Sequence, residues 1–237
     1  MKKIVVLSGA GISAESGIKT FRDQDGLWEN YDVNEVASIE GWYRNPELMV
    51  RFYNDRRRQL ATAQPNAAHR ILAEMEKDFN VVIATQNVDN LHERAGSTNV
   101  IHLHGELTKL CSEKNKNYVQ DIGYAEQQFG ETAPDGGRLR PFIVWFGEEV
   151  PRLVDAIEET NTADIMIVIG TSLNVYPAAN LLYYAPTQIP IYVIDPNDVQ
   201  PISRKVTFIK EKATTGMQQL KELLYQKNIK QLKINLL

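Results

Sequence analysis

Three small residues near the start of the chain have the spacing of a dinucleotide-binding turn. Gly9, Gly11 and Ala14 follow an apolar run at residues 4–7 and satisfy the pattern G-x-G-x-x-G/A. In such a turn the first glycine permits a sharp reversal and the second lets the backbone approach a pyrophosphate, while the next helix points N–H groups at the phosphates. The same residues could serve packing alone, so the following segment must show which kind of site this is.

The segment after the turn differs from that of a hydride-transferring dehydrogenase. Such an enzyme would continue through a helix to a second strand that ends in an acidic residue for the ribose. Here residues 16–26 are polar, contain glycine and lack a buried strand, so we interpret them as a long loop over the site. Phe21 could shield a reactive centre from water and Arg22 could pair with a phosphate, although either could simply anchor the loop.

Five segments, the turn included, resemble the signatures of the sirtuins, the NAD-dependent protein deacylases. In chain order they are residues 9–22, 85–92, 104–107, 144–148 and 170–173. They keep the family's order and spacing, with Lys19 where proline is usual. The resemblance implies that NAD is the co-substrate and that an acyl-lysine protein or peptide is the partner.

The resemblance also implies a role for each matching residue. His104 would act as general base on a ribose hydroxyl, with Asn87 and Gln86 beside it in the catalytic site. Histidine suits this work because its intrinsic pKa lies near the working pH. The co-substrate contacts would come from Gly9, Ala10, Gly11, Ile12, Phe21, Arg22, Gln86, Asn87, Val88, Asp89, Gly170, Thr171, Ser172, Asp195 and Ala213.

Gln86, Asn87 and Asp89 follow an apolar run at residues 81–84, at the carboxyl end of an expected strand. Ligands bind at that end in open α/β sheets. In the family, Asn87 and Asp89 line the nicotinamide pocket and Gln86 contacts ribose. Asp89 could also cap a helix that starts near residue 90, and the two roles are compatible.

One candidate segment for substrate binding lies late in the chain. The resemblance implies that an acyl-lysine peptide pairs with it as an added strand, so that backbone hydrogen bonds carry affinity. Its residues are Val144, Trp145, Phe146, Gly147 and Glu148. A plain core strand would account for Val144 and Phe146, but less well for the adjacent Trp145 and Gly147.

Tyr53 and Arg56 match a pair that, in one class of sirtuins, favours succinyl, malonyl or glutaryl lysine. Residues three apart share a helix face. Arginine offers a bidentate fork and tyrosine a hydroxyl donor, and both suit a carboxylate. The alternative is a solvated basic face at residues 56–58 with Tyr53 packed beneath it. We favour acyl binding because the family motif fixes the position of the pair.

The chain departs from the family at its metal site. Most sirtuins hold a structural zinc with four cysteines, and only Cys111 is present here, with Lys114, Thr132 and Asp135 at the other three places. One thiolate without a nearby histidine cannot form a closed tetrahedral site, so we expect no zinc. Packing should then stabilise this region, through Tyr118, Ile122, Tyr124 and Phe129.

Short apolar runs rich in β-branched residues predict the elements that position these side chains. The runs are residues 4–7, 81–84, 100–103, 142–146, 165–169, 191–194 and 206–209. Several lack alternation, which is typical of strands buried on both faces of a parallel sheet. Helical periodicity lies between them, at residues 66–77, 150–159 and 215–224. The sequence therefore predicts an α/β fold with a Rossmann-like parallel sheet, helices on both faces, and a smaller inserted lobe.

The limits of the two parts follow from where this alternation is interrupted. Residues 35–64 look helical, and residues 112–140 are polar with no strong period. We expect the ranges 1–34, 65–110 and 141–237 to form the Rossmann-like NAD-binding domain. The ranges 35–64 and 111–140 would form the smaller lobe.

The composition limits the kinds of binding partner and the cellular compartment that we expect. The 237 residues carry a formal net charge of −4, which disfavours a dedicated nucleic-acid binder. No apolar run approaches the length of a transmembrane helix. A single cysteine fits a reducing compartment. We therefore expect a cytoplasmic protein that has no nucleic-acid or membrane partner.

Three activities remain open at this point. The first is a lysine deacylase, acting on acetyl or on succinyl and malonyl groups. The second uses the same site for ADP-ribosyl transfer or NAD hydrolysis, and the third is a non-catalytic sensor of NAD or ADP-ribose. His104, Asn87 and Asp89 argue against a sensor, while Tyr53 and Arg56 favour the deacylase.

Overall fold

The central feature of the fold is a six-stranded parallel sheet with the order β3-β2-β1-β7-β8-β9. The computed structural model describes residues 1–19, 31–200 and 202–234. The strands are β1 (Lys3–Ser8), β2 (Asn80–Thr85), β3 (Val100–His102), β7 (Ile165–Ile169), β8 (Ile191–Ile194) and β9 (Thr207–Ile209). Each overlaps a predicted apolar run, so the prediction of a Rossmann-like parallel sheet is confirmed.

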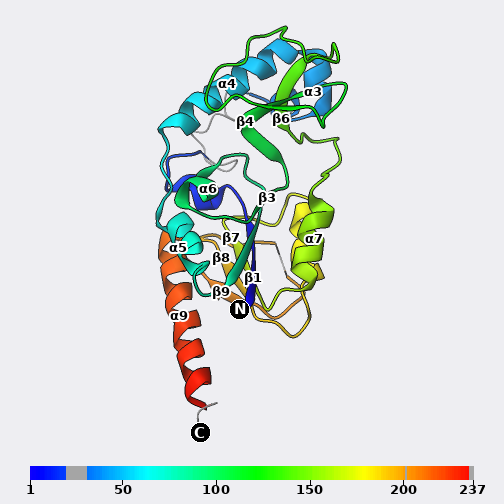
Figure 1. Cartoon of the computed structure of the whole chain (residues 1–237). Helices are drawn as coiled ribbons and strands as arrows, with labels where there is room; N and C mark the ends of the chain where they lie inside the picture. Colours follow the sequence, from blue (N-terminus) through cyan, green and yellow to red (C-terminus); the bar gives the residue numbers. More distant parts are fainter. Residues whose placement is uncertain (20–30, 201, 235–237) are drawn as a thin grey trace.

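Helices cover both faces of this sheet, which is why the central strands β1, β2, β7 and β8 are buried along nearly their whole length. They are α5 (Ala67–Met75) and α9 (Ala213–Ile234) on one face, and α7 (Leu153–Asn161) and α8 (Leu181–Tyr184) on the other. Along β1, Ile4 and Val6 pack toward the first pair while Val5 and Leu7 pack toward the second. Figure 1 shows α5 and α9 on one side of the sheet and α7 on the other. In the described ranges no helix is long and apolar enough to cross a membrane.

A smaller lobe lies beyond one end of the parallel sheet, at the top of Figure 1. Its elements are α2 (Val33–Val36), α3 (Ile39–Arg44), α4 (Pro46–Thr62), β4 (Gly105–Ser112), β5 (Val119–Asp121) and β6 (Leu139–Ile143). The three strands form an antiparallel sheet with the order β5-β4-β6. The lobe itself is therefore confirmed, and the exact domain limits stay a prediction.

The apolar run at residues 142–146 belongs to this lobe and not to the parallel sheet. It ends as a strand at Ile143, and β6 pairs with β4. The prediction that this run joins the same sheet as the others is wrong, because a short apolar run does not itself show which sheet it joins.

Fewer of the predicted apolar side chains are buried at the outer end of the lobe than the sequence indicates. Tyr118 and Ile122 pack as expected, but Tyr124 and Phe129 are 37% and 50% exposed. The buried cluster there consists of Leu110, Ala133 and Leu139. Because so few apolar side chains are removed from water, polar contacts must contribute to the stability of this end.

Those polar contacts centre on Ser112 and Asp135. The Ser112 hydroxyl lies 2.9 and 2.8 Å from the two carboxylate oxygens of Asp135 and accepts the Lys114 backbone N–H at 3.1 Å. Asp135 also accepts the Gly137 N–H at 2.9 Å, and hydrogen bonds from Gly137 and Ser112 lower the pKa of its carboxyl. Lys114 and Asp135 of this cluster stand at two of the four positions at which the family resemblance implies zinc ligands.

The residues at the four zinc positions do not fit a zinc ion. Cys111 supplies one thiol, whereas a closed zinc site needs four ligands. Lys114 is a cation, and Asp135 is engaged by Ser112. Within residues 1–19, 31–200 and 202–234, no group of three or more His, Cys, Asp or Glu side chains is arranged to hold a metal ion.

Ser112→Ala tests whether this hydrogen-bond cluster stabilises the lobe. Ser112 is fully buried, and its loss leaves neighbouring N–H groups without their acceptor. We expect the free energy of unfolding to fall by about 1–3 kcal/mol, measured by urea denaturation. Ser203→Ala, at an exposed serine, is the matched control and should change it by less than about 0.5 kcal/mol. Equal stabilities for the two variants would mean that apolar contacts alone hold this end.

Candidate active site

One cavity of about 720 Å³ lies at the carboxyl ends of the parallel strands. The strand order reverses between β1 and β7, and ligands bind at such switch points in open α/β sheets. Of the residues that the sequence assigned, those lining the cavity are Gly9, Ala10, Gly11, Tyr53, Arg56, Gln86, Asn87, Val88, Asp89, His104, Val144, Trp145, Phe146, Gly147, Glu148, Gly170, Thr171, Ser172, Asp195 and Ala213. A single site thus combines the expected nucleotide and substrate positions.

Among the assigned residues that the structure describes, Ile12 does not line the cavity. The Ile12 side chain is fully buried in the core on the α5 and α9 side of the sheet, because it points inward from the short helix α1 (Gly11–Ala14). Phe21 and Arg22 lie outside the described residues. Their expected contacts stay predictions.

The glycine turn after β1 is interlocked with the turn after β7. The Gly11 N–H donates to the Gly170 carbonyl at 2.9 Å. Gly170 has φ of +64°, and a Cβ there would lie 2.3 Å from the Ile12 nitrogen. A Cβ on Gly11 would lie 2.7 Å from the Gly170 Cα. Gly11 and Gly170 must be glycine because the backbones of the two turns are in contact. This part of the cavity wall is therefore formed mainly by backbone atoms.

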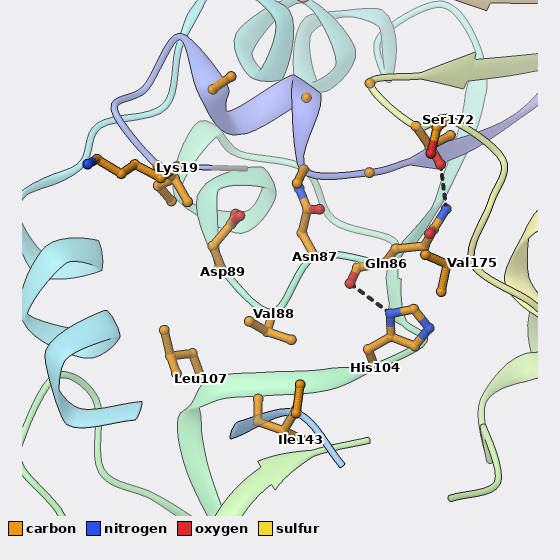
Figure 2. Close-up of a pocket in the computed structure, with 18 of the residues that line it drawn as sticks. Lys19, Gln86, Asn87, Val88, Asp89, His104, Leu107, Ile143, Ser172 and Val175 are labelled. Carbon is orange, nitrogen blue, oxygen red and sulfur yellow. Dashed lines mark hydrogen bonds between the residues drawn. The ribbon is translucent and has the colours of Figure 1, made fainter. Parts of the chain in front are cut away.

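His104 follows β3 and is oriented by the backbone of Gln86. Its Nδ1 lies 3.0 Å from the Gln86 carbonyl, a contact drawn as a dashed line in Figure 2. A carbonyl only accepts, so Nδ1 carries the proton and Nε2 is left as an acceptor. Burial lowers the pKa of His104, and the Gln86 carbonyl only partly opposes this. The imidazole is therefore neutral near pH 7 and can take up a proton at Nε2.

Asn87 and Asp89 are held together by Ser13 of the glycine turn. The Ser13 hydroxyl donates to an Asp89 oxygen at 3.0 Å, and the Asn87 side-chain amide donates to Ser13 at 3.2 Å. The other Asp89 oxygen accepts the Leu91 N–H at 3.1 Å, at the start of α6 (Leu91–Ala95). Asp89 therefore supports the helix and lines the cavity at once. Burial raises the pKa of its carboxyl.

The sequence did not single out Ser13 or His102, and both support this part of the site. His102 lies between the Asn87 carbonyl at 3.1 Å and the Glu93 carboxylate at 2.7 Å. Burial would lower the pKa of His102, but the hydrogen bond and charge of Glu93 raise it overall. Ser13 lies within the segment that carries the glycine motif, whereas nothing in the sequence pairs His102 with residues on two other elements.

The adenosine end is expected around β7 and β8. Thr171 follows β7, and its hydroxyl accepts the Gln86 side-chain amide at 3.2 Å. Asp195 follows β8, is 5% exposed, and accepts the Asn197 N–H at 2.9 Å. Ala213 begins α9 beside them on the cavity wall. Ribose hydroxyls would find a buried acceptor in the Asp195 carboxylate.

The opposite end of the cavity is formed by α4 and the segment after β6. Asn45 caps α4 by accepting the Leu48 N–H at 3.1 Å, and the buried helix face carries Tyr53 toward the cavity. The segment at residues 144–148 is fixed by its backbone, since the Val144 N–H donates to the His104 carbonyl at 2.9 Å. Its proposed pairing with a peptide stays a prediction.

A parallel sheet with a glycine turn at its switch point, together with a neutral histidine in the same cavity, defines a nucleotide-binding α/β protein equipped for proton transfer. The Sir2 family profile matches residues 9–177. The chain therefore belongs to the Sir2 family, and the resemblance seen in its motifs is confirmed.

Individual relatives cover nearly the whole chain. An NAD-dependent protein deacylase from Bacteroides thetaiotaomicron is 53% identical over 230 residues, which span 94% of this chain and 98% of the relative. Another from Helicobacter pylori is 54% identical, spanning 93% and 96%.

Solved structures agree with this assignment. A mutant Sir2 homologue in complex with ADP-ribose has a TM-score of 0.86 and 39% identity, covering 92% of this chain and 90% of that one. A Sir2 homologue in complex with NAD has a TM-score of 0.85 and 38% identity, covering 95% and 90%.

Proposed function

We propose that this protein is an NAD-dependent protein-lysine deacylase, which releases nicotinamide and transfers the acyl group to ADP-ribose. The observation that carries the proposal is the placement of His104, which lines the same cavity as the glycine turn and the acyl-pocket residues and whose Nδ1 is engaged by the Gln86 carbonyl. The relatives from Bacteroides thetaiotaomicron and Helicobacter pylori are named NAD-dependent protein deacylases, which supports the proposal.

The cavity fits NAD as a substrate. Gly11 and Gly170 present backbone with no side chain between them, which lets a pyrophosphate approach closely. Asp195 offers a buried carboxylate for ribose hydroxyls, and Asn87 with Asp89 would surround the nicotinamide. NAD supplies the ribose carbon at which the bond to nicotinamide breaks.

The protein's own residues would then direct the acyl transfer. The acyl oxygen of lysine attacks the ribose carbon as nicotinamide leaves. His104 takes the proton of a ribose hydroxyl at Nε2, so that this hydroxyl can attack the acyl carbon. The bond between the acyl carbon and the lysine nitrogen then breaks, and water adds to the acyl carbon, which leaves free lysine and O-acyl-ADP-ribose. Val88, Leu107 and Ile143 form an apolar wall beside His104, seen in Figure 2, which limits the access of water.

The preferred acyl group would be one that ends in a carboxylate. Tyr53 and Arg56 lie one turn apart on α4 and both line the cavity. An arginine fork and a tyrosine hydroxyl together suit succinyl or malonyl lysine. Burial lowers the pKa of the Arg56 guanidinium, while the charges of Tyr53 and Asp89 oppose this. A partly buried cation of this kind gains from an acyl carboxylate beside it.

Incubation with NAD and acetyl-, succinyl- or malonyl-lysine peptides tests the proposal. We expect free lysine peptide together with O-acyl-ADP-ribose, read by mass spectrometry, and a higher kcat/KM for the two acidic acyl groups. Nicotinamide release at the same rate without peptide would instead indicate NAD hydrolysis. Binding of NAD with no product at all would indicate a sensor.

A further inference from the structure

The hydroxyl of Tyr53 has its hydrogen-bonding direction set by a residue far away in the sequence. The indole Nε1–H of Trp145 donates to the Tyr53 Oη at 2.8 Å. An indole N–H is only a donor, so the tyrosine oxygen is the acceptor and its own proton is directed elsewhere. Burial raises the pKa of Tyr53 to about 12, so the hydroxyl keeps that proton near neutral pH. The proton can then be donated to an acceptor in the cavity that both residues line.

Trp145 is itself held by an ion pair behind the pocket. The guanidinium carbon of Arg140 lies 3.5 Å from the centroid of the indole ring. Both terminal nitrogens of Arg140 donate to Glu148, each at 2.8 Å, and Glu148 accepts the Trp145 backbone N–H at 3.0 Å. The indole is thus fixed from its own backbone and from the face of its ring.

This ion pair is strong enough to keep its geometry through the working pH range. Burial alone would raise the pKa of the Glu148 carboxyl, but hydrogen bonds and charge from Arg140, with help from Lys116, lower it to about 2. Arg140 also donates to the Ile143 carbonyl at 2.7 Å. Glu148 and Arg140 are 5% and 2% exposed at their side chains, so salt screens the pair only weakly.

We infer that Trp145 is a positioning residue for acyl selectivity, holding the Tyr53 hydroxyl as a donor toward the terminal carboxylate of the acyl group. The Arg140–Glu148 pair in turn fixes the indole. A carboxylate accepts hydrogen bonds, whereas an acetyl group ends in a methyl and offers no such acceptor. This role of Trp145 rests on the proposed preference for acidic acyl groups, and the hydrogen bond from Trp145 to Tyr53 would produce part of that preference.

A purely structural role for Trp145 makes a different prediction. Trp145 is 2% exposed and packs at 5.4 Å from the ring of Trp42, within the same buried cluster. If only packing mattered, loss of the indole would weaken the pocket for every acyl group. If the indole N–H positions the Tyr53 hydroxyl, activity falls only for acyl groups that end in a carboxylate, and only while Tyr53 keeps its hydroxyl.

A double-mutant cycle with Trp145→Phe and Tyr53→Phe separates the two roles. We expect Trp145→Phe to lower the ratio of kcat/KM for succinyl- over acetyl-lysine peptide about tenfold, mainly through KM for the succinyl peptide. In the Tyr53→Phe background the same change should have little further effect on the ratio. Arg140→Lys keeps the indole but loses the bidentate contact, and it should lower the ratio about threefold.

Trp42→Phe is the matched control for packing. Its indole N–H points to Glu113 at 3.4 Å and not to Tyr53, so the acyl ratio should stay unchanged. A ratio that falls equally in Trp42→Phe and Trp145→Phe, or additive effects in the cycle, would overturn the role of Trp145. A wild-type enzyme that deacetylates but leaves succinyl lysine intact would overturn the acyl preference itself, and this inference with it.

Discussion

Replacement of His104 by alanine will lower kcat/KM for peptide deacylation by about 10²–10⁴, the usual contribution of a general base. The imidazole is placed for this role because its Nδ1 is engaged by the Gln86 carbonyl, which leaves Nε2 to accept a proton. NAD should still bind, since the glycine turn and Asp195 are untouched. Steady-state kinetics with an acyl-lysine peptide and calorimetric titration with NAD measure the two effects separately.

The pH profile provides the control for this assignment. Burial lowers the pKa of His104 from its usual value of 6.5, and the base works in its neutral form. Activity is therefore retained as pH falls toward 6.5 and lost as pH falls further, through the lowered pKa. The midpoint of the acid limb in kcat/KM should lie below pH 6.5. A limb that persists unchanged in His104→Ala, or an active variant, would contradict the role of His104 as base.

The parallel sheet and the position of the site could be predicted from the sequence because both depend on local patterns. A strand covered on both faces must be apolar at every position, so the run at residues 4–7 predicts a central strand without knowledge of its neighbours. Polar residues that follow such runs then lie at one edge of the sheet. Gly9, Gln86 and Gly170 are far apart in the chain, yet all follow strands and meet in one cavity.

The contacts that tune the site could not be predicted, because they join residues whose separation carries no local signal. The partner of Tyr53 is Trp145, 92 residues later, and the partner of Ser112 is Asp135, across a segment without periodicity. Likewise, His102 bridges two elements only because the sheet brings them together. Hydrogen-bond partners of this kind follow from packing, so single-sequence patterns cannot assign them.

Replacement of Arg56 by methionine should lower kcat/KM for a succinyl-lysine peptide by about 10², because hydrogen bonds between charged groups contribute about 1.5–3 kcal/mol. Methionine retains much of the aliphatic bulk of arginine, so the change removes the guanidinium more than the packing. Parallel kinetics with succinyl- and acetyl-lysine peptides measure the effect as a ratio, in which any general loss of stability cancels.

Arg58→Met is the matched control on the same helix. Arg58 pairs with Asp55 and Glu126, its side chain is 56% exposed, and it does not line the cavity. Its replacement should leave the succinyl-to-acetyl ratio within about twofold of wild type, as expected for an exposed ion pair. Tyr53 would remain as a hydrogen-bond donor in Arg56→Met, so this variant should keep some preference for the succinyl peptide. Adding Tyr53→Phe to Arg56→Met should remove most of that remaining preference. A ratio that is the same in wild type, Arg56→Met and the Arg56→Met/Tyr53→Phe double variant would show that Tyr53 and Arg56 on α4 do not select the acyl group.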